Sequence, residues 1–254
     1  KSRVAISAPG RRDLDHAALS DLCQRTVDSL NGFGIGRNER VAIVLPNGPE
    51  MATAFVSVAC GATTAPLNPS YRQDEFRFYL EDLKAKALIV EAGSESPAVA
   101  AAKELGVPLI ELEVADGSAA GDFTLKASGL KSDATHPGFA QADDVGLILH
   151  TSGTTSRPKI VPLSQKNLAA SARNISATLG LTAEDRCLNI MPLFHIHGLI
   201  AAVLTSLSAG ASVYCTPGFN ALKGFSSLED CKPSWYTAEP TMHQAILSRA
   251  SRNK

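Results

Sequence analysis

One short run of the sequence combines hydroxyl groups, a glycine and two cations. It comprises Thr151, Ser152, Gly153, Thr154, Thr155, Ser156, Arg157, Pro158 and Lys159. Small residues leave backbone N–H groups open to a ligand, and a nest of such donors favours anions, above all phosphates. Arg157 and Lys159 add positive charge, and Pro158 stiffens the turn between them. The run is therefore predicted to bind phosphate groups, and a triphosphate is its natural ligand.

Three other interpretations of this run are less favoured by the sequence. A polar surface hairpin without function is the simplest, but the apolar segments on both sides of the run favour a binding loop. A P-loop is excluded because the chain contains no G-x-x-x-x-G-K-[ST] sequence. A hydrolytic nucleophile at Ser152 is not indicated, since no G-x-S-x-G elbow surrounds it. His150, directly before the run, is predicted to pack against it.

A second candidate group is His195-Ile196-His197. Two histidines at this spacing point to the same side if they lie on a strand, and imidazole is a good zinc ligand. A catalytic zinc site needs a third ligand with recognisable spacing, and the sequence presents none, so we predict no metal site. Two interpretations of His195 remain: a residue that shapes a substrate pocket, and a hydrogen-bonded histidine of the core.

Short apolar runs recur along the chain and predict strands that are buried on both faces, as in parallel or mixed sheets. The expected strands cover residues 41–45, 87–90, 107–112, 145–149, 188–191, 211–215 and 234–237. A further short strand, 159–161, returns from the small-residue run. Residues 116–144 are rich in Ala, Gly, Ser and Asp, and this composition predicts a surface loop.

Amphipathic helical patterns alternate with these strands. They cover residues 19–30, 76–83 and 168–179, and Ser164 is placed to cap the last of them. Alternation of strands and helices predicts an α/β fold. Residues 197–221 lack charge, but serines and a glycine interrupt them, so they predict a buried helix followed by a strand and not a membrane span.

Composition narrows the class of protein. The 254 residues are 44% hydrophobic and 19% charged, which is ordinary for a globular chain with a large core. The formal net charge of -1 argues against nucleic acid as a partner. Five cysteines without a C-x-x-C pair indicate free thiols in a reducing compartment. We see no signal peptide at the start of the sequence.

The run at 151–159 resembles the signature loop of the adenylate-forming enzymes, whose usual form is T-S-G-T-T-G-x-P-K-G. Three further segments are similar to this family and extend the resemblance over nearly the whole chain: "MPLFHIHGL" at 191–199, "WYTAEPTMHQAIL" at 235–247 and the first β-α-β unit at 41–71. Ser156, where glycine is usual, resembles the oxalate–CoA ligase branch, which includes peroxisomal CoA synthetases of yeast. Ile160 and Glu239 depart from the family, which usually has glycine and valine there.

The resemblance implies an α/β fold of a particular kind. The chain would be the N-terminal domain of the adenylate-forming fold, incomplete, with two stacked αβ subdomains and mostly parallel sheets. Residues 1–254 would form a partial AMP-binding domain, with approximate sublobes 37–182 and 1–36 plus 183–254. The family's C-terminal domain is absent from the sequence.

The resemblance also implies roles for residues of the run. Thr151, Ser152, Gly153, Thr154, Thr155 and Lys159 would bind the phosphates of ATP. Arg157 would give weaker electrostatic support. Lys159 and His195 would be catalytic, with His195 beside the junction of the acyl group and the nucleotide.

The implied reaction is activation of a carboxylic acid with ATP and Mg²⁺ through an acyl-adenylate, followed by thioester formation with CoA. The chain lacks the family's Y-G-x-T-E motif, ribose-binding aspartate and C-terminal lysine, so by itself it is expected to be inactive. The alternative is a non-catalytic nucleotide- or phosphate-binding module derived from that fold. Expected partners are small molecules only, and the expected location is the cytoplasm or the peroxisome. Oligomeric state is left open.

Overall fold

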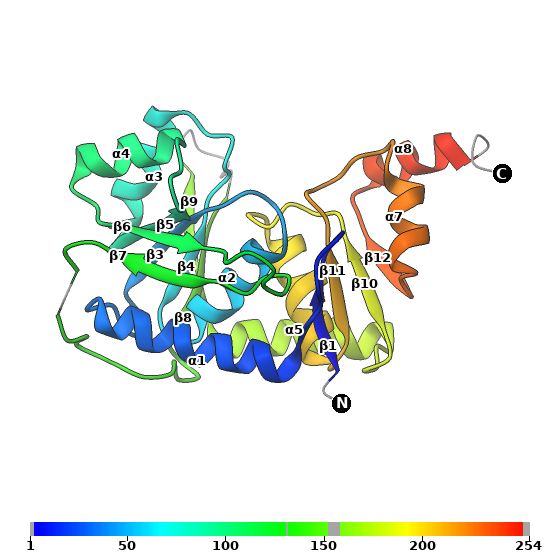
Figure 1. Ribbon diagram of the computed structural model, residues 1–254, viewed down its shortest axis with the longest axis horizontal. Helices are drawn as coiled ribbons and strands as arrows, with labels where there is room; N and C mark the ends of the chain where they lie inside the picture. The colour runs from blue at the N-terminus through cyan, green and yellow to red at the C-terminus, as the bar shows by residue number, and fades with distance from the viewer. Residues whose placement is uncertain (1–2, 131, 152–157, 251–254) are drawn as a thin grey trace.

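Two β-sheets lie side by side in the computed structural model, which describes residues 3–130, 132–151 and 158–250 (Figure 1). Within these residues the larger sheet has seven strands in the order β7-β6-β5-β3-β4-β8-β9. Its five central strands are parallel, whereas β7 and β9 are antiparallel at the two edges. The strands are β3 (Arg40–Val44), β4 (Thr63–Pro66), β5 (Ala87–Glu91), β6 (Leu109–Glu113), β7 (Thr124–Ala127), β8 (Val145–Thr151) and β9 (Lys159–Ser164).

The smaller sheet brings the two ends of the described chain together. Its five strands follow the order β12-β10-β11-β1-β2 within the described residues. They are β1 (Val4–Ser7), β2 (Leu14–Asp15), β10 (Arg186–Asn189), β11 (Ser212–Cys215) and β12 (Trp235–Thr237). Strand β1 runs parallel to β11, with Ile6 opposite Val213. The short β2 pairs with β1 in the antiparallel direction at one edge.

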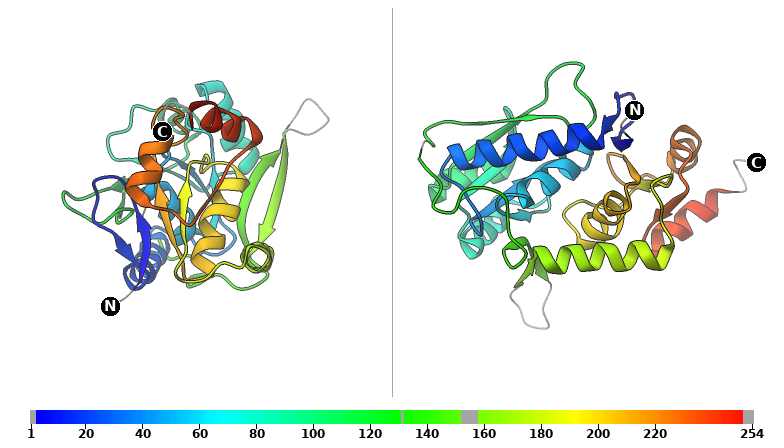
Figure 2. Two further views of the ribbon diagram at one scale, coloured as in Figure 1. Left: turned by 90° about the vertical axis from the view of Figure 1, so that its right-hand side faces the viewer. Right: turned by 90° about the horizontal axis from the view of Figure 1, so that it is seen from below.

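Helices connect and cover the strands. They are α1 (His16–Gly32), α2 (Pro49–Ala59), α3 (Gln73–Leu83), α4 (Pro97–Leu105), α5 (Gln165–Leu179), η1 (His197–Leu204), α6 (Thr205–Ser208), α7 (Gly224–Cys231) and α8 (Pro240–Ala250). Helix α1 contacts β1 and β2 of the smaller sheet and β7 of the larger one, whereas α5 contacts β8 and β9 of the larger sheet and the helices η1 and α6. Figure 2 shows these two helices along one side of the molecule.

Side-chain chemistry explains where two of the helices begin. Asp15 precedes α1 and accepts a hydrogen bond from the N–H of Ala18 at 2.8 Å. Ser164 precedes α5 and accepts one from the N–H of Asn167 at 3.2 Å, while the Asn167 side chain accepts from the N–H of Ser164. Each bond satisfies a backbone donor that lacks a partner inside the helix. The predicted cap at Ser164 is confirmed.

A single apolar cluster, called here the shared core, joins the two sheets. It includes Ile43 of β3, Phe55 of α2 and Val213 of β11, all with no exposed surface. Helix α2 is central to it, because this helix contacts β3 and β4 on one side and β11 and η1 on the other. A second cluster lies between the larger sheet and helices α3 and α4. Burial of both faces of the larger sheet explains the continuous apolar runs of its strands.

Asn47 adds a polar link between the two sheets. It lies in the loop between β3 and α2, and its Nδ2 donates to the carbonyl oxygen of Thr216 after β11 at 3.1 Å. Its Oδ1 accepts from the N–H of Leu193 after β10 at 2.7 Å. The carboxyl ends of strands in both sheets are thereby fixed relative to one another.

The α/β architecture predicted from the sequence is confirmed, and each predicted strand is present with bounds shifted by at most three residues. The uncharged stretch at 197–221 is a buried helical segment followed by β11, as expected. The prediction that residues 116–144 form only a loop is wrong, because β7 lies there and pairs with β6. Its half-exposed residues, on an edge strand, carry no apolar run that would mark it. No helix in the described part of the chain combines the length and apolar character needed to cross a membrane.

Candidate functional site

The predicted phosphate-binding run is carried by the hairpin of β8 and β9 at the edge of the larger sheet (Figure 2). The two strands are antiparallel, and their register places Thr151 directly opposite Lys159. Both residues are exposed. Opposite residues in an antiparallel pair project from the same face, so the hydroxyl and the ammonium group are neighbours. Six predicted residues, Ser152, Gly153, Thr154, Thr155, Ser156 and Arg157, lie outside the described residues.

The face on which these two side chains project follows from the strand. Leu147 and Leu149 of β8 contact the shared core, while Ile148 points to the opposite cluster beneath α3. Because side chains alternate along a strand, Thr151 lies on the face of Leu147 and Leu149, and Lys159 shares it. This is the face covered by elements that also contact the smaller sheet. Thr151 and Lys159 are therefore on the face of the larger sheet that packs against the shared core, toward the smaller sheet.

His150 anchors the base of the hairpin to α3. Its Nε2 lies 3.0 Å from Asp82 Oδ2, and its ring packs edge-on against Tyr79 with 4.6 Å between ring centroids. Tyr79 in turn stacks on Tyr71. The His150 side chain is only 6% exposed. His150 thus packs against α3 and fixes the backbone from which the run begins, whereas its predicted packing against residues 152–157 lies outside the described residues.

Burial lowers the pKa of His150 below the ordinary value of 6.5, and the neighbouring Asp82 only partly opposes this shift. The unfolded chain then binds a proton at a higher pH than the folded chain does. The free energy of unfolding should consequently fall as the pH is lowered from about 7.5 to about 5.5. In His150→Phe, which keeps an aromatic ring beside Tyr79, this fall should be smaller. Urea unfolding at the two pH values measures it, and an equal fall in both proteins would contradict the assignment.

His195 lies in the smaller-sheet lobe, in the turn between β10 and η1. Its side chain is exposed, and its Nδ1 accepts a hydrogen bond from the N–H of His197 at 3.3 Å. The interpretation as a core histidine does not fit this exposure. Among the described residues, no hydrogen bond or ion pair joins His195 to Thr151 or Lys159. The structure therefore brings Thr151 and Lys159 together at the edge of the larger sheet and leaves His195 beside the smaller sheet.

The helix after His195 has an unusual geometry. Residues His197–Leu204 form a π-helix, a rare conformation that often occurs at functional sites. The hydroxyl of Thr205 donates to the carbonyl oxygen of Ile200, five residues earlier, at 2.8 Å. At Gly198 a side-chain carbon would collide with the Pro192 carbonyl, so only glycine lets η1 start this close to the turn. The turn that holds His195 is thus tightly constrained.

His197 does not share the environment of His195. Its Nε2 lies 2.6 Å from the hydroxyl oxygen of Thr237 in β12, and burial lowers its pKa. The two histidines lie in a turn and at a helix start, so the argument for a metal pair on one strand does not apply. Within the described residues, no group of three or more His, Cys, Asp or Glu side chains is placed to hold a metal ion.

The two residues that depart from the resembled family have ordinary surroundings. Ile160 of β9 is half-buried and packs against the cluster beneath α3. Glu239 is exposed just before α8, where its backbone carbonyl accepts from the N–H groups of Met242 and His243. Its carboxylate acts electrostatically on His197 and raises that residue's pKa, against the larger effect of burial. Neither residue blocks the face that carries Thr151 and Lys159.

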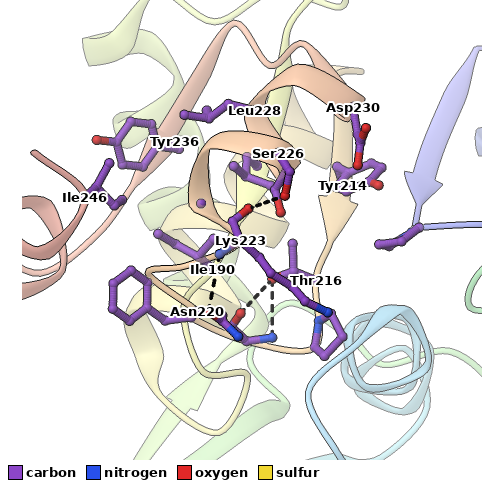
Figure 3. Close-up of a pocket in the computed structure, with 17 residues that line it drawn as sticks. Ile190, Tyr214, Thr216, Asn220, Lys223, Ser226, Leu228, Asp230, Tyr236 and Ile246 are labelled. Atoms are coloured by element: carbon purple, nitrogen blue, oxygen red, sulfur yellow. Dashed lines mark hydrogen bonds between the residues drawn. The ribbon is translucent and has the colours of Figure 1, made fainter. Parts of the chain in front are cut away.

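A cavity of about 520 Å³ lies beside the smaller sheet, next to α7 and α8 (Figure 3). Tyr236 and Ile246 lie across it from Tyr214 and Thr216, and Lys223 is the one cation among its described lining residues. Its walls are mainly aromatic and aliphatic. Such a cavity suits an apolar group, whereas a small dianion would find little to bind. Thr151, Lys159 and His195, the predicted site residues that the structure describes, do not line it.

A polar cavity of about 270 Å³ between the sheets was not anticipated from the sequence. Arg11, before β2, forms an ion pair with Glu50 at 3.2 Å and donates to the carbonyl oxygen of Ala119 at 3.0 Å. Burial, and secondly the charge of Glu50, raise the pKa of Glu91 across the cavity. Only the strand topology places these residues together, and no local sequence pattern marks them.

Comparison with known protein sequences identifies a family and several similar CoA ligases. The sequence profile of the family described as AMP-binding enzyme matches residues 1–254. Oxalate–CoA ligase of Arabidopsis thaliana is 41% identical over 97% of this chain and 49% of that protein. Oxalate–CoA ligase of Saccharomyces cerevisiae is 35% identical over 95% of this chain and 49% of that protein. Indoleacetate–CoA ligase of Aromatoleum aromaticum is 33% identical over 97% and 48% of the two chains.

Solved structures of a similar fold include two of MatB. MatB from Rhodopseudomonas palustris without ligand has a TM-score of 0.79 at 25% identity, over 97% of this chain and 48% of that chain. Its ATP-bound structure has a TM-score of 0.78 at 25% identity, over 96% and 48%. The chain therefore spans about half the length of the curated relatives and of these structures.

Proposed function

The chain belongs to the AMP-binding enzyme family, and from that premise we propose that it is the ATP-phosphate-holding part of an acyl-CoA synthetase. In the proposed reaction a carboxylate oxygen attacks the α-phosphorus of ATP and pyrophosphate leaves. A thiolate sulfur of CoA then attacks the acyl carbon, and AMP leaves. The observation that carries the proposal is the β8–β9 hairpin, which sets Thr151 opposite Lys159 at the two ends of the Ser/Thr/Gly run.

The proposed work of the run is electrostatic. Negative charge builds up on the departing β- and γ-phosphates as the bond to the α-phosphorus breaks. Donors that are fixed before the reaction stabilise that charge without reorganising. Thr151, Ser152, Gly153, Thr154, Thr155 and Lys159 are the proposed donors. His150, held by Asp82, would keep the first of them in place.

Magnesium is proposed to arrive with ATP. Mg²⁺ usually keeps several waters and binds through substrate phosphates with one or two carboxylates. The described residues present no cluster of three or more suitable side chains, so this part of the chain does not supply a cage for the ion. His195 is proposed to lie beside the acyl group, on the basis of its exposed position ahead of η1.

Oxalate is the proposed carboxylic acid, supported by two oxalate–CoA ligases among the relatives, at 41% and 35% identity. Other relatives act on different acids, including indoleacetate, so the specificity needs a direct test. The 254 residues contain no Y-G-x-T-E motif. We therefore do not expect them to catalyse acyl-adenylate formation by themselves. The proposed location is the cytoplasm or the peroxisome, with which five free thiols are compatible.

A panel of carboxylic acids distinguishes these possibilities. The protein that contains this chain together with its downstream sequence should show ATP–pyrophosphate exchange that depends on the acid. We expect kcat/KM for oxalate to exceed that for indoleacetate and for a medium-chain fatty acid by at least about 100-fold, because a site that pairs both carboxylates of oxalate leaves buried polar groups unpaired with a monoacid. A higher value for a fatty acid would overturn oxalate but keep the ligase. Absence of exchange with every acid would favour a non-catalytic nucleotide-binding module.

A further inference from the structure

Two of the five cysteines meet where α1 passes the end of α2. Cys23 lies on α1 and Cys60 directly follows α2, two helices that pack against each other, and both side chains contact the shared core. The backbones approach closely at this point. One residue further on, a side-chain carbon at Gly61 would come within 2.9 Å of Val27, which lies one helical turn after Cys23. This close packing of the end of α2 on α1 places the two cysteines on facing surfaces.

The Cys60 thiol also has a route to solvent. Cys60 is half-buried and lines a cavity of about 260 Å³ between α2 and α5. The other walls are mostly apolar, with Phe55, Leu168, Ala172 and Leu204 among them. Cys23 is almost fully buried, at 9% exposed, and does not line this cavity. A small apolar molecule that enters would therefore meet Cys60 first.

The two cysteines also differ in exposure and in the direction of their pKa shifts. The Cys23 thiol lowers the pKa of Cys60, against the opposing effect of burial, whereas the same contact and burial raise the pKa of Cys23. A thiolate is the nucleophilic form of cysteine, so Cys60 is the one prepared to attack. Burial raises the pKa of the three remaining cysteines, Cys187, Cys215 and Cys231.

We propose that Cys60 is an oxidation site for organic hydroperoxides that enter the apolar cavity, and that Cys23 then closes a disulfide with it. In the first step the Cys60 sulfur attacks the terminal peroxide oxygen, the O–O bond breaks, and the alcohol leaves with a proton. Cys60 is then a sulfenic acid. In the second step the Cys23 sulfur attacks the Cys60 sulfur, and the hydroxyl leaves as water with the Cys23 proton. The thiols lose two electrons and the hydroperoxide gains them.

The direct test treats the folded chain with cumene hydroperoxide, removes the excess, unfolds the protein and counts its thiols. The number should fall from five to three, because two are consumed. Peptide mapping without reductant should recover one cross-linked pair, which contains Cys23 and Cys60. A different pair, or five remaining thiols, would overturn the proposal.

Variants distinguish the thiol that is oxidised first, Cys60, from the thiol that closes the disulfide, Cys23. Cys23→Ser should stop at the sulfenic acid, which dimedone traps on Cys60. Cys60→Ser should give neither disulfide nor dimedone adduct. Cys231→Ser is the matched control, because it removes a thiol from the second lobe and should still form the Cys23–Cys60 bond. Circular dichroism of each variant checks that it is folded, and Cys60→Ala replaces Cys60→Ser if the latter is not.

A further variant tests the route of entry. Ala169 lines the mouth of the cavity and is exposed, so Ala169→Leu narrows the opening without overfilling the core. The rate of disulfide formation with cumene hydroperoxide should fall at least about tenfold, while the rate with hydrogen peroxide changes less than about twofold. Equal changes with both peroxides would contradict the entry through this cavity.

Discussion

Replacing Lys159 by alanine should slow carboxylate-dependent ATP–pyrophosphate exchange by about 100-fold to 1,000-fold in the enzyme that contains this chain. Lys159 begins β9, projects beside Thr151 and is exposed, and no ion pair within the described residues engages its ammonium group. Its charge is thus available to the pyrophosphate that leaves. Loss of a donor aimed at developing charge removes stabilisation of the transition state, so kcat should fall more than the affinity for ATP does.

Two companion variants sharpen this result. Lys159→Arg keeps the positive charge on a longer and planar group, and it should recover part of the rate. Lys166→Ala is the matched control, because Lys166 at the start of α5 pairs with Asp143 on the surface, at 3.2 Å. Its removal should leave exchange unchanged within about twofold, since an exposed ion pair contributes little. Exchange that is insensitive to Lys159→Ala would refute the phosphate-binding assignment of the run.

The largest loss of stability is expected for Phe55→Ala. Phe55 has no exposed surface and lies in α2, the helix that contacts both sheets through the shared core. Removal of a buried aromatic ring typically costs about 3–5 kcal/mol, because the transfer energy is lost and a cavity remains. For a chain of this size the melting temperature should fall by about 10 °C. Chemical denaturation and thermal melting measure the two quantities.

Phe139→Ala is the matched control for this substitution. Phe139 is 50% exposed, so the same truncation should change the free energy of unfolding by no more than about 0.5 kcal/mol. Equal losses for the two variants would mean that Phe55 is not in a core that joins the sheets.

Strands and helices with strong local patterns could be predicted from the sequence. The runs that became β3, β5, β8 and β11 are buried on both faces, so their apolar character is unbroken and easily recognised. β7 escaped prediction because it is an edge strand with alternating exposure. The partner of β1 could not be predicted, because its neighbour β11 is distant in sequence and apolar pattern does not specify which strands pair.

The candidate site was predictable to a similar, limited extent. The composition of the run indicated a phosphate ligand, but the register that sets Thr151 beside Lys159 depends on strand pairing. The phosphate-binding role of residues 152–157 stays a prediction. The turn geometry around His195 was missed, since a π-helix has no sequence signature comparable to strand alternation. The link through Asn47 was also missed, because its partners Thr216 and Leu193 come from a distant part of the chain.

The place of β1 in the smaller sheet has a consequence for how the molecule assembles during synthesis. Residues of the larger sheet are contiguous along the chain, from β3 to β9, so that sheet can form while translation continues. Ile6, by contrast, pairs with Val213, about 200 residues later, and must wait until β11 has been made. Closing so long a loop is slow, and until then β1 and the face of α2 that meets β11 are exposed. Nascent chains that end before Val213 should therefore depend most strongly on chaperones.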